Sequence, residues 1–213
     1  MVMAEATNHY FKHLGVSDGL SQVCIPSIYQ DELGAVWLGT TEGLNRYNGK
    51  DVKVFQPSES NHGLTNNEIN ELCGDKNGRM YIRSGNDLIK LDIYTEQFTC
   101  LRQKGVYGLF CKKDTLWVSC ADGIYYYTGQ GTELTFFARV QKGFVGRALY
   151  VDRETVWVVT RKYLVAISRE DPLRQEILLT LDKGNCILGD SSGNIWVGAW
   201  NGLYRVSPEI GRA

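Results

Sequence analysis

The sequence has little of what marks several common protein classes. Proline is scarce, with 4 residues among 213, and histidine occurs only three times. No window approaches 18 apolar residues, so no segment is predicted to cross a membrane as a helix. The first residues lack a basic stretch followed by an apolar one, so we expect no signal peptide at this end.

The sequence also has no large excess of positive or negative charge. The formal net charge is −1, with 22% charged and 43% hydrophobic residues. This profile is that of an ordinary soluble globular protein. Without a basic stripe there is no electrostatic footprint for nucleic acid, so we expect no nucleic-acid contact by this segment.

Motifs for catalysis and metal binding are missing as well. There is no Walker A sequence, no GxSxG turn and no HExxH pair. His9 and His13 lie four apart in a segment that we predict to be a strand, so they would share a face, but a third ligand is lacking. We therefore expect no catalytic residue, no metal and no cofactor in this segment.

The six cysteines form no CxxC pair, and a disulfide framework is not expected. Cys73 and Cys111 fall near the ends of predicted first strands, where a free thiol behaves as a small apolar group. Taken alone, this usage favours a reducing compartment.

What the sequence does have is glycine, aromatic residues and an internal repeat. Residues 31–47 and 190–206 share Asp, Gly, Trp, Gly, Gly, Leu and Arg at equal offsets, 159 residues apart. Aligning the chain on the Trp gives five aromatic anchors, and six residues after each comes a turn residue followed by an aliphatic one. The anchors are Trp37, Tyr81, Trp117, Trp157 and Trp196.

The spacing and turn chemistry of the repeat predict a β-propeller. The anchors are 44, 36, 40 and 39 residues apart, a period shared by propeller blades and helical repeats. No stretch keeps a 3.6-residue apolar period, whereas short β-rich runs alternate with Asp-x-x-Gly and Asn-Gly turns. We therefore predict an all-β fold with four-stranded blades, about five of them, as part of a seven-bladed ring.

The predicted organisation is a single propeller domain in which each anchor aromatic is buried between neighbouring blades. Residues 57–66 form a polar loop between the first two blades. The predicted segments are a closing strand and lead-in at 1–26, blade one at 27–56, blade two at 67–101, blade three at 105–138, blade four at 146–181, and an incomplete blade five at 185–207.

The opening of the chain resembles a known family. "GVSDGLSQ" and "IYQDELGAVWLGTTEGLNRYNGKDVKVF" look like the start of the regulator-propeller sensor domains of hybrid two-component histidine kinases. Blade one matches the family's repeat almost fully, and blade five matches it in part. In blades two to four Arg83, Ser119 and Val159 replace its second glycine.

The resemblance implies a periplasmic, non-enzymatic sensor segment of an inner-membrane protein that responds to oligosaccharides. The rest of the chain in this family supplies a kinase core and regulates transcription of glycan-utilisation genes. This location conflicts with the cysteine usage, although buried thiols stay reduced where oxygen is lacking. Two alternatives remain open: a propeller lyase of the streptogramin-lyase type and a propeller for protein–protein interaction.

Loops between second and third strands, and loops between blades, emerge on one face of a propeller around its channel. Trp200 lies in such a turn outside the anchor series, so we expect it to be a stacking platform for a sugar ring. The residues expected to bind the ligand are Glu42, Arg102, Asp122, Arg147, Arg161, Trp200 and Asn201.

Blade five lacks a predicted outer strand, and an unpaired sheet edge invites another strand. Residues 9–14 alternate as a strand would and belong to no blade. We therefore predict that they pair antiparallel with 203–207, within one molecule or by exchange between two, which would give a homodimer. The other outcome that we expect is an open arc with a free edge.

Overall fold

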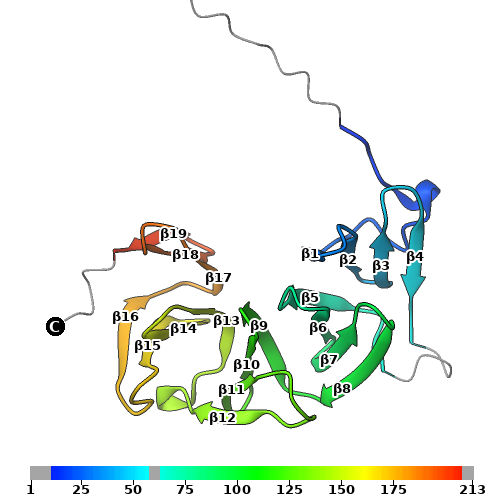
Figure 1. Cartoon of the computed structure of the whole chain (residues 1–213). Helices are drawn as coiled ribbons and strands as arrows, with labels where there is room; N and C mark the ends of the chain where they lie inside the picture. Colours follow the sequence, from blue (N-terminus) through cyan, green and yellow to red (C-terminus); the bar gives the residue numbers. More distant parts are fainter. Residues whose placement is uncertain (1–10, 58–62, 208–213) are drawn as a thin grey trace, which may run out of the picture.

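The chain folds into an arc of five antiparallel sheets, each a blade, as seen in this computed structural model of residues 11–57 and 63–207 (Figure 1). The expected all-β propeller fold is confirmed. Blades one to four each have four strands in the order of the chain, and blade five has three. The first strand of each blade lines the inner side of the arc, and the fourth strand of each complete blade lies on the outside (Figure 1).

The strands are short because turns recur every few residues. Blade one consists of β1 (Ser27–Gln30), β2 (Val36–Thr40), β3 (Gly43–Tyr47) and β4 (Val52–Phe55). Blade two consists of β5 (Ile69–Gly74), β6 (Arg79–Ser84), β7 (Asp87–Asp92) and β8 (Gln97–Arg102). Blade three consists of β9 (Val106–Lys112), β10 (Thr115–Cys120), β11 (Gly123–Tyr127) and β12 (Thr135–Ala138).

Blade four consists of β13 (Gly146–Val151), β14 (Thr155–Thr160), β15 (Tyr163–Ser168) and β16 (Gln175–Thr180). Blade five consists of β17 (Gly184–Gly189), β18 (Ile195–Ala199) and β19 (Gly202–Val206). Two single-turn 3-10 helices, Val16–Asp18 and Gln141–Gly143, precede blades one and four.

Each pair of neighbouring blades encloses one apolar cluster, and the anchor aromatic of the earlier blade lies in it. Trp37 packs with Ile69 and Leu72 of blade two, and Trp157 packs with Ile195 and Val197 of blade five. Tyr81 and Trp117 occupy the two clusters between these. The four clusters hold the arc together because sheets stack face to face on their apolar sides.

Trp196 departs from the expectation that every anchor is buried. Trp37, Tyr81, Trp117 and Trp157 are buried, but Trp196 is only half-buried. The reason is its place in the arc, because no further blade among the described residues covers its face of blade five. Leu203, in the position of the buried Leu164 one blade earlier, is 70% exposed for the same reason.

The predicted closing strand is not formed by the described part of the N-terminal segment. Residues 11–15 carry no strand, and 9–10 lie outside the described residues. The lead-in instead lies against blade one, where Lys12 Nζ donates to Tyr47 Oη over 3.2 Å and the Ser21 amide donates to Asn45 Oδ1 over 2.9 Å. Blade one is at the opposite end of the arc from β19 (Figure 1), so the outer edge of β19 has no partner strand within the described ranges.

Candidate functional site

The turns between second and third strands and the loops between blades share one face of the arc, here called the loop face. Backbone hydrogen bonds tie the two kinds of segment together in every blade. The Gly43 amide donates to Asn67 O over 2.8 Å, and the Trp200 amide donates to Asp182 O over 2.9 Å. The loop face is therefore held by main-chain contacts, which set the backbone positions from which its side chains project.

Arg102 and Asp122 form a closed pair between blades two and three. Arg102 Nη2 lies 2.8 Å from Asp122 Oδ1, and the guanidinium stacks 4.7 Å from the Tyr125 ring centroid. Tyr125 Oη donates to the other carboxylate oxygen over 2.9 Å. Burial would raise the pKa of Asp122, but the hydrogen bonds from Arg102 and Tyr125 outweigh it and lower that pKa. Both side chains already have partners, so this pair is a poor ligand site.

Arg147, Arg161 and Trp200 come together on the loop face of blades four and five. They line a cavity of about 450 Å³ with Lys183 and Asn185. Arg147 and Arg161 also line a second cavity of about 390 Å³. The two cavities adjoin because they share both arginines, and we call them together the Trp200 site. Each has the size of an ordinary small-molecule pocket.

The Trp200 ring is 78% exposed, and Lys183 Nζ lies 4.6 Å from its centroid. The second cavity is also lined by two aromatic residues, Tyr107 and Phe144. Apolar rings beside a few polar groups are what a sugar needs for stacking and hydrogen bonding.

Sequence reasoning missed several members of the Trp200 site. Lys162 and Lys183 lie on loops of the expected face, but the sequence does not show which of the charged loop residues meet in one place. Tyr107 lies in β9 and was indistinguishable from a strand aromatic. Only the folding of blades three to five onto one another brings these side chains to one place.

Besides Arg102 and Asp122, two further expected residues are not part of the Trp200 site. Glu42 is exposed in the β2–β3 turn of blade one and lines neither cavity, and Gln56 Nε2 donates to its carbonyl oxygen over 2.8 Å. Asn201 is exposed beside Trp200 but does not line either cavity.

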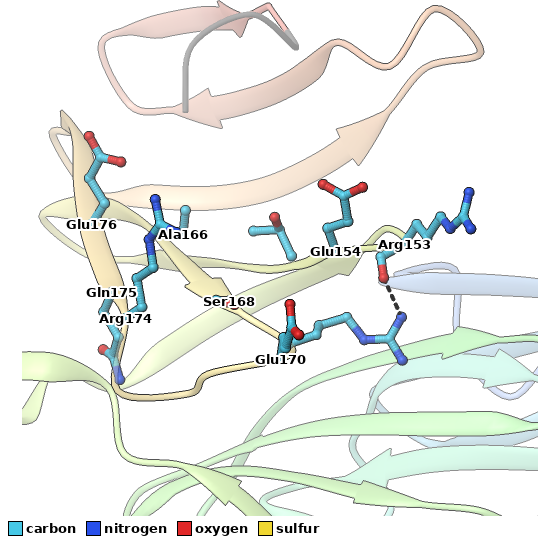
Figure 2. Close-up of a pocket in the computed structure, with 10 residues that line it drawn as sticks. Arg153, Glu154, Ala166, Ser168, Glu170, Arg174, Gln175 and Glu176 are labelled. Carbon is cyan, nitrogen blue, oxygen red and sulfur yellow. Dashed lines mark hydrogen bonds between the residues drawn. The ribbon is translucent and has the colours of Figure 1, made fainter. Parts of the chain in front are cut away.

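A larger cavity, of about 820 Å³, lies elsewhere, beside the outer half of blade four (Figure 2). It is lined by Arg153, Glu154, Glu176 and neighbouring residues of both charge signs. Ala166 and Glu176 lie opposite Trp157 across the sheet and so share its face, which is turned toward blade five. Among the described residues blade five has three strands, so no fourth strand there covers the outer half of this face of blade four, which accounts for the space without a ligand.

Neither metal-binding clusters nor membrane-spanning helices occur in the described part of the chain. No group of three or more His, Cys, Asp or Glu side chains there could hold a metal ion. Over the same residues, no helix has the length and apolar character needed to cross a membrane.

Comparison with known proteins confirms the resemblance to regulator propellers. Residues 19–42 match the family model of the two component regulator propeller. A stretch of 53 residues is 40% identical to histidine kinase P4 of Formosa agariphila, over 25% of this chain and 4% of that protein.

The fold is shared with larger solved propellers. The extracellular domain of the hybrid two component system BT3049 from B. thetaiotaomicron superposes with a TM-score of 0.80 at 23% identity, over 92% of this chain and 30% of that one. A streptogramin B lyase superposes with a TM-score of 0.64 at 16% identity, over 89% of this chain and 71% of the lyase. The chain is thus a partial β-propeller and spans less than a third of the sensor structure.

Proposed function

We propose that this chain is a ligand-sensing propeller segment of an extracytoplasmic two-component sensor, without enzymatic activity of its own. The match to the regulator-propeller repeat, the stretch shared with a histidine kinase and the fold shared with a sensor's extracellular domain support this proposal. The lyase has the same kind of fold, so the fold alone does not choose a function.

The ligand in this proposal is an oligosaccharide, and its binding controls a kinase core that regulates genes for glycan use. The segment lies in the periplasm and acts together with the rest of a sensor kinase chain in a larger ring, of seven blades as the resemblance suggests. The observation that carries the proposal is the exposed Trp200 ring beside two cavities on the loop face. An aromatic ring held on a turn with its face in solvent gives a sugar ring a flat apolar surface.

The proposal is tested by replacing the ring. Trp200→Ala should weaken oligosaccharide binding about tenfold, which corresponds to roughly 1.4 kcal/mol and lies within the range of an aromatic contact. The thermal midpoint should stay within a few degrees, since the ring is largely exposed. Isothermal titration calorimetry with an oligosaccharide panel and a thermal melt give both values.

Tyr94→Ala is the matched control, because Tyr94 is also an exposed aromatic residue on a turn. Its turn joins the third and fourth strands of blade two and so lies on the face opposite the loop face. This variant should bind as the unchanged protein does. Equal losses of folding and binding in Trp200→Ala would assign the ring to structure rather than to a ligand.

A further inference from the structure

We propose that the Trp200 site takes an anionic saccharide, one that carries a carboxylate or a sulfate ester. This inference rests on the proposed function and adds the chemical class of the ligand. It starts from four cations, Arg147, Arg161, Lys162 and Lys183, that line the two adjoining cavities. All four are exposed.

Among the described residues, these four cations have no carboxylate partner, in contrast to three arginines on blades one and two. Arg46, Arg83 and Arg102 form ion pairs with Glu96, Glu71 and Asp122. No carboxylate is among the residues that line the two cavities, and within residues 11–57 and 63–207 no ion pair involves any of the four cations. Positive charge therefore accumulates here in a chain whose net charge is −1.

The distribution of charge along the loop face points the same way. On blades one and two the corresponding turns and interblade loops carry Glu42 and Glu68, and on blade three Asp122 is neutralised by Arg102. The loop between blades two and three carries the exposed Lys104, whereas on blades four and five four cations line one pair of adjoining cavities. The exposed Asp182, in the loop before blade five, lines neither cavity. Charges of one sign gathered at a cleft attract a ligand of the other sign and speed its association.

The geometry fits a sugar acid better than a neutral sugar. Arg147 and Arg161 lie where the two cavities meet, and a guanidinium presents a planar fork of donors that matches a carboxylate or a sulfate. The Trp200 ring and the Tyr107 ring lie in different cavities, so saccharide units on either side of the anionic group would each meet an aromatic side chain.

The test compares charged and neutral forms of the same oligosaccharides. The probes are a galacturonic acid tetramer with its carboxyl-reduced form, and a sulfated galactan tetramer with its desulfated form. We expect one of the charged forms to bind, its neutral form to bind at least tenfold more weakly, and the affinity to fall as NaCl rises. The two pairs separate the carboxylate from the sulfate.

A double variant combines Arg147→Gln with Arg161→Gln. The control is Arg153→Gln, because Arg153 is an exposed arginine in the β13–β14 turn, on the face opposite the loop face. The double variant should lose binding at least tenfold while the control does not. Equal binding of charged and neutral forms would overturn the anionic ligand and leave the sensing proposal intact. If none of the four oligosaccharides binds, both the anionic ligand and the sensing proposal are overturned.

A second inference has an independent basis in two thiols. We propose that Cys73 and Cys111 form a disulfide that joins blades two and three when the protein folds under oxidising conditions. The cysteines lie on β5 and β9, and their Sγ atoms are 2.8 Å apart. Both thiols are free in this structure, yet little movement would bring them to the roughly 2.05 Å of a disulfide bond.

The oxidation needs a disulfide reagent such as oxidised glutathione. Each of the two thiols gives up one hydrogen, the new S–S bond forms, and the reagent leaves as two reduced thiols. Burial raises the pKa of Cys73 well above its usual value, so the exchange is slow in the folded state and is best achieved during refolding.

Peptide mapping without reductant, after refolding with oxidised glutathione, should show the two cysteine peptides linked. The cross-link should raise the Tm by roughly 5–10 °C. Cys73→Ser should abolish this rise, whereas Cys186→Ser, which removes an exposed thiol on blade five, should keep it. Recovery of both Cys73 and Cys111 as free thiols after oxidative refolding would overturn the proposal.

Discussion

Single aspartates connect the turns of this protein to its core. In blades one, four and five a carboxylate in the turn before the second strand accepts from the anchor's indole N–H, with Asp31, Asp152 and Asp190 at 2.7, 2.7 and 2.8 Å. The same carboxylate accepts backbone amides of its own turn. In blade two the anchor is Tyr81, and Asp75 pairs with Arg79 instead. One side chain thus orders a turn and orients the aromatic anchor.

Replacing Asp31 tests this double role. Its buried carboxylate accepts from the Leu33 and Ala35 amides at 3.0 and 2.9 Å as well as from Trp37. Asp31→Ala should lower the free energy of unfolding by about 2–4 kcal/mol, because buried donors lose their partner. Urea unfolding measures this loss. Asp51→Ala, at an exposed position of the same blade, should change stability by less than about 0.5 kcal/mol, and equal losses would contradict the role of Asp31.

Asp190 predicts a dependence of stability on pH. Hydrogen bonds from Trp196 and Asn194 lower its pKa from 3.8 to about 2. The folded state therefore holds the proton less tightly than the unfolded state does. The stabilisation is complete above about pH 3.8 and is lost as the pH falls through about 2.

Thermal melts from pH 5 to pH 2 test this behaviour. The stability advantage of the unchanged protein over Asp190→Asn should be constant near pH 5 and should shrink toward pH 2. An advantage that stays the same over the whole range would assign the effect to another group.

At the scale of elements, stacking of the blades depends on close approach of strands. Gly39 of β2 lies so near blade two that a Cβ would stand 2.8 Å from Ile69 Cγ2 and 3.0 Å from Ile69 O. Gly198 holds the same place in the motif of blade five, but a Cβ there would meet only the Cys186 sulfur. The same motif glycine is thus required for packing in one blade and not in the other.

The pair of glycines offers a matched experiment. Gly39→Ala should destabilise the fold by about 1–3 kcal/mol, because the backbone of β5 must move to admit the methyl group. Gly198→Ala should cost less, because the exposed Cys186 side chain can turn away. Denaturant unfolding of both variants measures the difference, and a larger loss in Gly198→Ala would show that blade five is covered in solution.

The whole molecule is an arc with two ends, and the ends differ. The lead-in covers part of blade one, where Leu20 is buried. The last face of blade five carries Leu188, Trp196 and Leu203, with the two leucines 65% and 70% exposed. In each earlier blade the equivalent face is buried against the next sheet.

Two leucines at the same position of the repeat can be used to measure how much burial against a following blade contributes to the free energy of unfolding. Leu164→Ala, in the buried interface between blades four and five, should cost about 2–5 kcal/mol of unfolding free energy. Leu203→Ala should change it by less than about 0.5 kcal/mol. Similar losses in urea unfolding would mean that a second molecule covers the last face.

The sequence by itself determined the fold class, through local rules. Turn residues such as Asp31 and Gly34 and the anchor spacing predicted short antiparallel strands in about five blades, because turn geometry and strand alternation depend on neighbours in the chain. It also placed Arg161 and Trp200 on turns, whereas Arg147, predicted to lie in a loop between blades, is the second residue of β13. Their meeting with Lys183 and Tyr107 could not be read from the sequence, since these residues come from three different blades.

Burial and pairing were decided only by the tertiary structure. Leu164 and Leu203 have the same motif, yet one is buried and the other exposed, because burial depends on the next sheet and not on the residue itself. The strand predicted at 9–14 is not formed by the described residues of that range, because the lead-in makes its hydrogen bonds to blade one instead. Likewise, Arg102 forms an ion pair with Asp122, whereas Arg161 lines a cavity and forms no ion pair among the described residues. The difference arises because the neighbouring blade brings a carboxylate within ion-pair distance of Arg102 but, in the described part of the chain, not of Arg161.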